Sequence, residues 1–141
     1  YNFENRFSKI FGKNSIDKIS FKNSFEKVIL NSKLIIMTYP QTAFSEAMCS
    51  NVPTIMVIKN NHWILTDTSL HMFETLKKNK IAFNNFDDAK IHIDKYWDNL
   101  DLWWKSDNVQ LARKKYLKSY FNVKLNLFKE WSDFINSQHK L

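Results

Sequence analysis

Apolar runs and helical spacings alternate through the centre of the chain. Lys33–Thr38 and Thr54–Ile58 are apolar without alternation, which is typical of strands covered on both faces of a parallel sheet. Between them, Thr42–Ser50 has a helical pattern, and Pro53 follows its end. Strand, helix and strand over about 25 residues indicate a βαβ unit with a right-handed crossover.

The flanking segments predict further helices and short strands. The first 15 residues are ambiguous, although the spacing of their apolar residues fits a short helix. Ile16–Phe21 and Ile81–Phe83 have the length of short strands. Helical spacing recurs in five further segments: Ser24–Asn31, Asp67–Asn79, Phe86–Leu100, Asp107–Phe121 and Val123–Ser137. We expect these side chains to face inward: Leu70, Phe73, Leu76, Phe86, Ala89, Ile93, Trp97, Leu127, Trp131 and Phe134 or Ile135.

These elements predict an α/β fold, a Rossmann-like parallel sheet flanked by helices with a C-terminal helical extension. The 141 residues suffice for one domain with a hydrophobic core. We expect a single domain over residues 1–141, with the α/β core in 16–100 and the helical extension in 101–141. The chain starts with tyrosine, which favours a fragment or a processed piece.

The net charge of +7 comes almost entirely from lysine, since Arg6 and Arg113 are the two arginines. Nucleic-acid readers usually use arginine, so the charge favours a solvated face over a nucleic-acid surface. Weak attraction to nucleotides or to acidic lipids stays open. The single cysteine, Cys49, favours a cytoplasmic setting and is expected to be a buried apolar residue. No apolar run has the roughly 18–20 residues of a membrane span, so we expect a cytoplasmic location, with peripheral association at the inner face of the membrane left open.

The segment from Tyr39 to Glu46 carries the chemistry of the βαβ unit. In open parallel sheets, ligands bind beyond the carboxyl ends of the strands, where the next helix points its free amides. Thr42 is the expected N-cap residue, and Glu46 lies one turn later on the same face. A diphosphate could bind the helix start and a ribose could bind the carboxylate. A capped helix with a surface glutamate is the competing interpretation.

The same stretch resembles the donor-nucleotide motif of glycosyltransferases with two Rossmann-like domains, the GT-B architecture. The chain resembles more closely a family of bacterial surface-carbohydrate transferases, over roughly residues 16–135. The matching motifs are Tyr39-Pro40-Gln41-Thr42, Glu46-Ala47, Asn51-Val52-Pro53-Thr54-Ile55, Trp103-Trp104 and Val109-Gln110-Leu111-Ala112-Arg113. Asn51 stands where many such transferases have glycine, and it suits the left-handed residue that must end the helix.

The resemblance implies a transferase that needs no metal or other cofactor and uses a nucleotide-sugar donor, UDP- or CMP-linked, in cell-surface polysaccharide synthesis. The amides of Gln41, Thr42, Ala43 and Phe44 and the Thr42 hydroxyl would stabilise the departing diphosphate, and Glu46 would hold the ribose. The acceptor site and the catalytic base would come from an amino-terminal Rossmann-like half. The catalytic residues are therefore unassigned, and the isolated chain is expected to bind without catalysing.

His62 and Trp63 are further candidates, on the loop that follows the second strand. An indole could stack on a base or sugar and an imidazole could contact a phosphate, although a packing role for Trp63 competes. Thr66 or Asp67 is expected to cap the next helix. The histidine spacing matches no zinc signature and predicts no metal site. Trp97, Trp103, Trp104 and Trp131 are expected to be core residues.

Two other functions stay open at this stage. A nucleotide-sugar epimerase of similar architecture would need acidic residues from both halves. A basic, aromatic-rich module that binds nucleic acid or a protein partner without catalysis would show steep salt dependence. The low arginine content and the buried strands argue against this last alternative.

Overall fold

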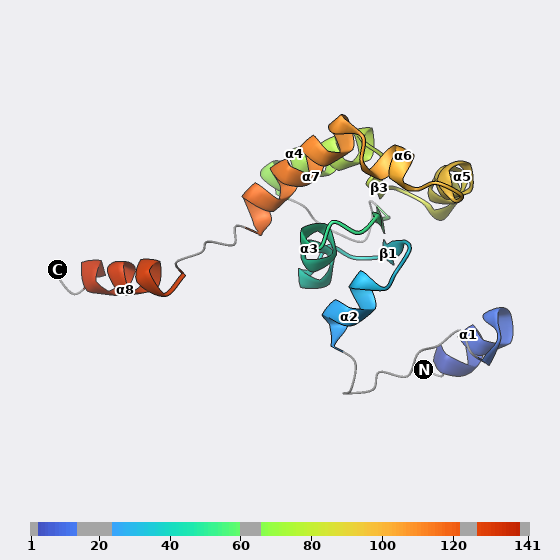
Figure 1. Ribbon diagram of the computed structural model, residues 1–141, viewed down its shortest axis with the longest axis horizontal. Helices are drawn as coiled ribbons and strands as arrows, with labels where there is room; N and C mark the ends of the chain where they lie inside the picture. The colour runs from blue at the N-terminus through green and yellow to red at the C-terminus, as the bar shows by residue number, and fades with distance from the viewer. Residues whose placement is uncertain (1–2, 14–23, 60–65, 122–126, 139–141) are drawn as a thin grey trace. The chain divides into compact units, whose positions relative to one another are not determined.

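The computed structural model describes residues 3–13, 24–59, 66–121 and 127–138 (Figure 1). The chain forms two compact units, residues 1–31 and 32–141. The first unit holds α1 (Phe3–Phe11) and α2 (Phe25–Leu30). Ser24 begins α2 by accepting a hydrogen bond from the Lys27 amide. The helices expected in this region are confirmed, and the strand expected at Ile16–Phe21 lies outside the described residues.

The second unit is built on a parallel sheet whose described strands are three, in the order β1-β2-β3. Met37 of β1 pairs with Met56 of β2, and Met56 pairs with Ala82 of β3. The strands and the helices between and after them are β1 (Ile35–Met37), α3 (Thr42–Cys49), β2 (Thr54–Val57), α4 (Asp67–Lys78), β3 (Ala82–Phe83), α5 (Phe86–Tyr96), α6 (Asp101–Trp104), α7 (Asp107–Tyr120) and α8 (Leu127–Gln138). The predicted α/β fold with a parallel sheet flanked by helices is confirmed.

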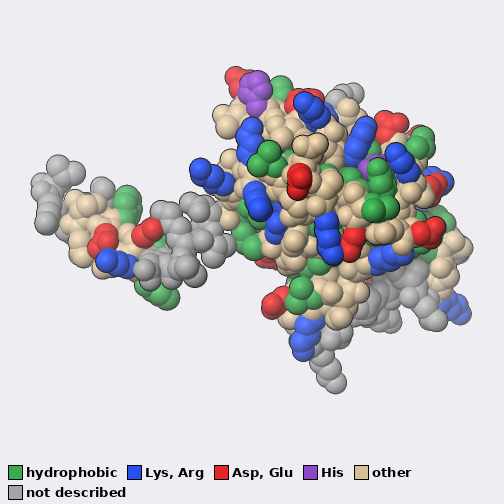
Figure 2. All heavy atoms as spheres, turned by 45° about the horizontal axis from the view of Figure 1, so that its top comes forward, with side chains coloured by type: hydrophobic (Ala, Val, Ile, Leu, Met, Phe, Trp, Pro, Cys, Tyr) green, Lys and Arg blue, Asp and Glu red, His purple; other side chains and the backbone are tan. Residues whose placement is uncertain are grey.

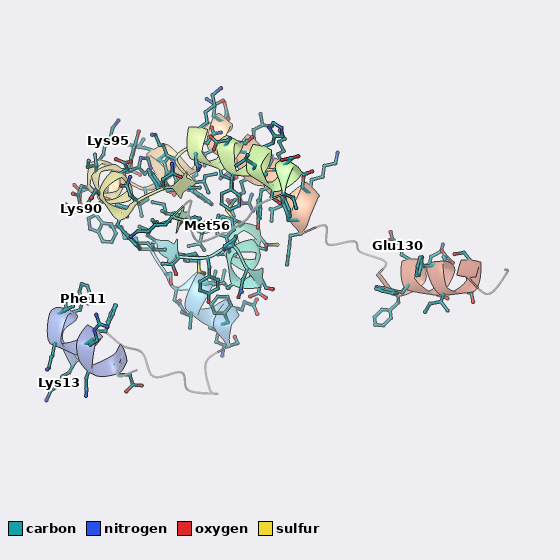
Figure 3. All side chains as sticks on the ribbon, turned by 180° about the vertical axis from the view of Figure 1, so that it is seen from behind. Phe11, Lys13, Met56, Lys90, Lys95 and Glu130 are labelled. Atoms are coloured by element: carbon teal, nitrogen blue, oxygen red, sulfur yellow. The ribbon has the colours of Figure 1, made fainter. Side chains whose placement is uncertain are left out.

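Helix α7 packs on both α3 and α4, and α5 packs on β2 and β3. Figure 1 shows α4 and α7 running alongside each other. Every residue of β2 is buried, and Met56 lies in the interior (Figure 3). The Thr54 hydroxyl is buried without penalty because it donates to the Val52 carbonyl at 2.7 Å. The core therefore centres on β2, the strand that has a neighbour on each side.

The residue that ends α3 adopts the conformation expected from the sequence. Asn51 has φ 57°, in the left-handed region that glycine and asparagine tolerate best. It reverses the chain after Ser50, so that the segment through Pro53 leads directly into β2. The short loop keeps β1, α3 and β2 contiguous and fixes where α3 begins relative to the sheet.

Several expected core positions are exposed in the structure. The exposed fractions are 50% for Ile36, 48% for Leu70, 55% for Phe86 and 47% for Trp97. The face of α4 that packs on the core carries Met72, Phe73 and Leu76. Leu70 is exposed because it lies on a different face of the helix. The described residues leave the outer side of β1 uncovered at Ile36.

The helix expected over Phe86–Leu100 is interrupted. α5 ends at Tyr96 and α6 begins at Asp101. Phe86 is the first residue of α5, directly after the N-cap residue Asn85. Trp97 follows the end of α5, and its ring lies 4.2 Å from the Lys33 ammonium, a cation–π contact.

Two further expectations of burial were wrong. Cys49 is exposed because α3 buries Phe44, Ser45, Ala47 and Met48, and the last helical position points away from that face. In α8, Trp131, Phe134 and Ile135 are about half exposed, at 58%, 57% and 49%. The described chain thus provides no complete cover for the apolar face of α8.

Candidate functional site

The start of α3 lies beyond the carboxyl end of β1, at the edge of the sheet where ligands of parallel α/β folds bind. Two of its four candidate amides donate within the chain: Gln41 to the Tyr39 carbonyl at 3.2 Å, and Phe44 to the Gln41 carbonyl at 2.9 Å. The amides of Thr42 and Ala43 have no partner among the described residues. These two N–H groups, at the positive end of the helix dipole, are the ones available to an anion.

The N-cap residue of α3 is Gln41, and Thr42 is the first helical residue. Gln41 is extended, with φ −120° and ψ −174°, and its carbonyl already accepts the first helical hydrogen bond. The expectation that Thr42 is the cap was therefore wrong by one position. Its hydroxyl makes no capping bond and is exposed, so it is free to meet a ligand instead.

The side chains of the α3 start differ in their access to solvent. Gln41 and Thr42 are exposed, Ala43 is partly buried, and Phe44 is fully buried. The Phe44 ring packs edge-on against Tyr116, with ring centroids 5.2 Å apart. Phe44 therefore acts in the core.

Glu46 lies one turn after Thr42, on the face of α3 opposite the buried Phe44 and Met48. Its side chain is partly buried, and its carboxylate makes no hydrogen bond or ion pair with the described residues. Its main-chain carbonyl accepts from the Ser50 hydroxyl at 3.0 Å. The carboxylate therefore lies on the same face of α3 as Thr42 and has no partner in the part of the chain that the structure describes. His62 and Trp63 lie outside the described residues.

A buried hydroxyl pair joins α3 to α7. The Ser45 and Tyr116 hydroxyls are 2.9 Å apart, and each residue is more than 90% buried. Burial raises the pKa of Tyr116, and the Ser45 hydrogen bond partly opposes this rise. Nothing in the sequence pattern pointed to this pair, because its members are 71 positions apart. It fixes the first turn of α3 against α7.

The motif residues that carried the resemblance gather at the opposite, carboxyl end of α3. The Trp104 indole donates to the Asn51 carbonyl at 2.9 Å and lies 3.1 Å from its side-chain oxygen. The Gln110 amide donates to the Trp104 carbonyl at 2.7 Å. Arg113 donates to the Met48 carbonyl at 2.6 Å and to the Cys49 carbonyl at 3.1 Å. We call Asn51, Trp104, Gln110 and Arg113 the α3 clamp.

Arg113 is the charged residue buried in the described core, at 9% exposure. No carboxylate pairs with it there, and burial lowers the pKa of its guanidinium. The carbonyls at the negative end of the α3 dipole take the place of a counter-ion. The α3 clamp is therefore structural: its hydrogen bonds hold the carboxyl end of α3.

The adjacent residues Trp103 and Trp104 each donate a hydrogen bond to the carboxyl end of a different helix. While Trp104 binds the turn after α3, the Trp103 indole donates to the Asn79 carbonyl at the end of α4, at 3.1 Å. Both residues are buried, Trp103 at 5% exposure and Trp104 at 1%. The core role expected for this pair is confirmed. The hydrogen bond that each indole donates was not expected from the sequence.

His92 is packed among aromatic rings. The centroids of Phe83, Tyr96 and Trp103 lie 5.5, 4.9 and 4.8 Å from the imidazole, and its buried Nε2 has no hydrogen-bond partner among the described residues. Burial, with the charges of Lys80 and Lys95, lowers the pKa of His92 to about 4 from 6.5. Lys95 extends from α5 beside Tyr96 (Figure 3).

Stability is expected to fall as the pH drops from 6.5 toward 4, because the unfolded chain binds a proton at His92 in this interval and the folded chain does not. Since the imidazole is partly exposed, we expect a loss of about 1 kcal/mol. Urea unfolding at several pH values measures it. The His92→Phe variant should lose this part of the pH dependence, whereas the exposed His71→Gln control should keep it; equal slopes in both would contradict the assignment.

Charge on the visible face is mixed. Figure 2 shows Lys and Arg side chains interspersed with Asp and Glu. Lysines also pair along the helices: the partly buried Lys77 pairs with Glu74, and the exposed Lys105 pairs with Asp101. Among the described residues, no group of three His, Cys, Asp or Glu residues could hold a metal ion. None of the described helices has the length and apolar character needed to cross a membrane.

Comparison with known proteins identifies a family that matches the chain. No curated protein and no solved structure matches the chain. The model of the LIC12162 family of transferases matches residues 1–135, which include β1, α3, β2 and the α3 clamp. That match covers far more than half of the 141 residues. The chain therefore belongs to the LIC12162 transferase family.

Proposed function

We propose that this chain is the donor-binding half of a GT-B glycosyltransferase that acts in cell-surface polysaccharide synthesis. The observation that carries the proposal is the start of α3, where the Thr42 and Ala43 amides lack a partner among the described residues. They lie at the carboxyl edge of a parallel sheet, and the chain belongs to a transferase family. The donor would be a nucleotide sugar linked to UDP or CMP.

The α3 start would bind the phosphate groups of the donor. During transfer, the bond between the sugar and the phosphate oxygen breaks, and negative charge grows on the departing phosphate or diphosphate. Oriented N–H groups and a hydroxyl stabilise such charge without needing to reorganise. The Thr42 and Ala43 amides and the Thr42 hydroxyl are the groups placed for this role.

Glu46 would hold the ribose. Its carboxylate shares an outer face of α3 with Thr42 and has no partner among the described residues. Two vicinal hydroxyls can donate to one carboxylate, and such charge-assisted hydrogen bonds are stronger than neutral ones. The acceptor site and the catalytic base would come from an amino-terminal Rossmann-like half, and His62 and Trp63 stay predicted donor contacts.

Calorimetric titration of the protein with UDP, CMP and GDP tests the proposal. We expect one of these nucleotides to bind, and the Glu46→Gln variant to bind it about 10- to 100-fold more weakly, since hydrogen bonds to a charged group are lost. Glu74→Gln is the matched control, because Glu74 lies on α4 and pairs with Lys77. Absence of heat with all of the nucleotides, or equal affinities of the two variants, would contradict the proposal.

A further inference from the structure

The C-terminal end of α7 lies beside the start of α3, because the two helices run antiparallel. Arg113 contacts the carbonyls of Met48 and Cys49 at the end of α3. One turn later, Tyr116 contacts Ser45 in the first turn of α3. Continuing along α7 by four residues, about 6 Å at the helical rise, brings Tyr120 level with the helix start.

Tyr120 also reaches the start of α4. Its hydroxyl donates to the Ser69 hydroxyl at 3.3 Å, and Ser69 lies in the first turn of that helix. Thr66, the N-cap of α4, donates to the same Ser69 oxygen at 3.0 Å. Tyr120 therefore contacts the start of α4, the helix that follows β2, and its place along α7 brings it near the start of α3, at the sheet edge proposed to bind the donor.

The ring of Tyr120 is held in place on one side, and the residue is exposed to solvent. It stacks on Tyr116, with centroids 5.1 Å apart and an interplanar angle of 29°. Tyr116 is itself fixed by Ser45 and by the edge-on contact with Phe44. Yet 42% of Tyr120 remains exposed. A stacked ring with a tethered hydroxyl loses little conformational entropy when a second flat group packs on it.

We propose that Tyr120 is a ligand-binding residue whose exposed ring stacks on the nucleobase of the donor. This inference rests on the proposed function and adds the subsite for the base. A neutral, flat ligand group suits an aromatic surface, whereas a phosphate would need amides or cations. The phosphates would lie at Thr42 and Ala43, and the base would lie toward α7 and α4.

Titration with whichever of UDP, CMP and GDP the protein binds, and with inorganic pyrophosphate, separates the base subsite from the phosphate subsite. The variants are Tyr120→Ala, Tyr120→Leu, which keeps an apolar side chain without a ring, and Tyr120→Phe, which keeps the ring. We expect the alanine and leucine variants to bind that nucleotide about tenfold or more weakly, and the phenylalanine variant to stay within about threefold of the original protein. Pyrophosphate affinity should not change in any of them.

Leu111→Ala is the control on the same helix, since Leu111 is 69% exposed and lies before Arg113, toward the other end of α3. Unchanged affinity of Tyr120→Leu for the nucleotide, or an equal loss in Tyr120→Phe, would overturn the stacking role. A matching loss of pyrophosphate affinity would also overturn it, because a distorted phosphate site would then explain both. If the original protein bound neither UDP, CMP nor GDP, the proposed function would fail first, and the base subsite with it.

Discussion

The Trp104→Ala variant is expected to lose about 3–5 kcal/mol of unfolding free energy, the range for deleting a large buried aromatic side chain. Trp104 is only 1% exposed and packs 5.2 Å from the Trp103 ring. Its indole also donates to the Asn51 carbonyl, so removal opens a cavity and leaves a carbonyl without its donor. Urea unfolding followed by far-ultraviolet circular dichroism measures the loss.

Trp97→Ala is the matched control, because Trp97 is 47% exposed and contacts Lys33 near the surface. We expect it to cost about 1 kcal/mol or less, as surface substitutions usually do. Trp104→Phe retains most of the ring volume and removes the N–H group, so its smaller loss reports the hydrogen bond to Asn51. Similar losses for Trp104→Ala and Trp97→Ala would contradict the assignment of Trp104 to the core.

The second large effect is expected at Arg113. Replacing it by methionine keeps the apolar stem and removes the donors to the Met48 and Cys49 carbonyls. We expect a loss of about 2–3 kcal/mol, because two hydrogen bonds from a buried, charged group to the end of α3 are lost. The unfolding free energy of Arg113→Lys should lie between those of the original protein and Arg113→Met, since one ammonium cannot reproduce the paired donors of a guanidinium.

Lys114→Met provides the control for Arg113, because Lys114 is the next residue of α7 and is exposed. Its substitution should change the unfolding free energy by about 0.5 kcal/mol or less. Urea midpoints of the variants give the comparison. An Arg113→Met variant as stable as Lys114→Met would show that the α3 clamp does not stabilise the fold.

The positions of β2 and α3 could be predicted from the sequence because each has a strong local signal. β2 is a continuous apolar run, and α3 lies between a proline turn and the left-handed Asn51. The exposure of Ile36 and Leu70 could not be predicted in the same way. A pattern identifies an apolar face, whereas the neighbouring elements decide how that face is rotated and how much of it is covered.

The candidate site was predictable in part. The sequence indicates that a helix starts beyond β1 and that Thr42 and Glu46 share one of its faces. Which amides donate within the chain depends on the conformation of Gln41, which the sequence does not reveal. The pairing of Tyr116 with Ser45 depends on how α7 packs across α3, a contact between distant segments that no local pattern encodes.

The motifs behind the resemblance have different roles in the structure. Trp103, Trp104, Gln110 and Arg113 hold the ends of α3 and α4, whereas Thr42 and Glu46 lie at the free start of α3. The same helix is thus fixed at its carboxyl end and available to a ligand at its amino end. We infer that the clamp motifs preserve the geometry of the site without contacting the donor.

The central claim, that the start of α3 binds the phosphates of a nucleotide, is tested most directly by nuclear magnetic resonance of the ¹⁵N-labelled protein during titration with UDP, CMP and GDP. With the nucleotide that binds, we predict the largest amide shifts at Thr42 and Ala43 and small shifts at the clamp residues Gln110 and Arg113. Binding that leaves the Thr42 and Ala43 signals in place, or no shift with any of the nucleotides, would contradict the claim.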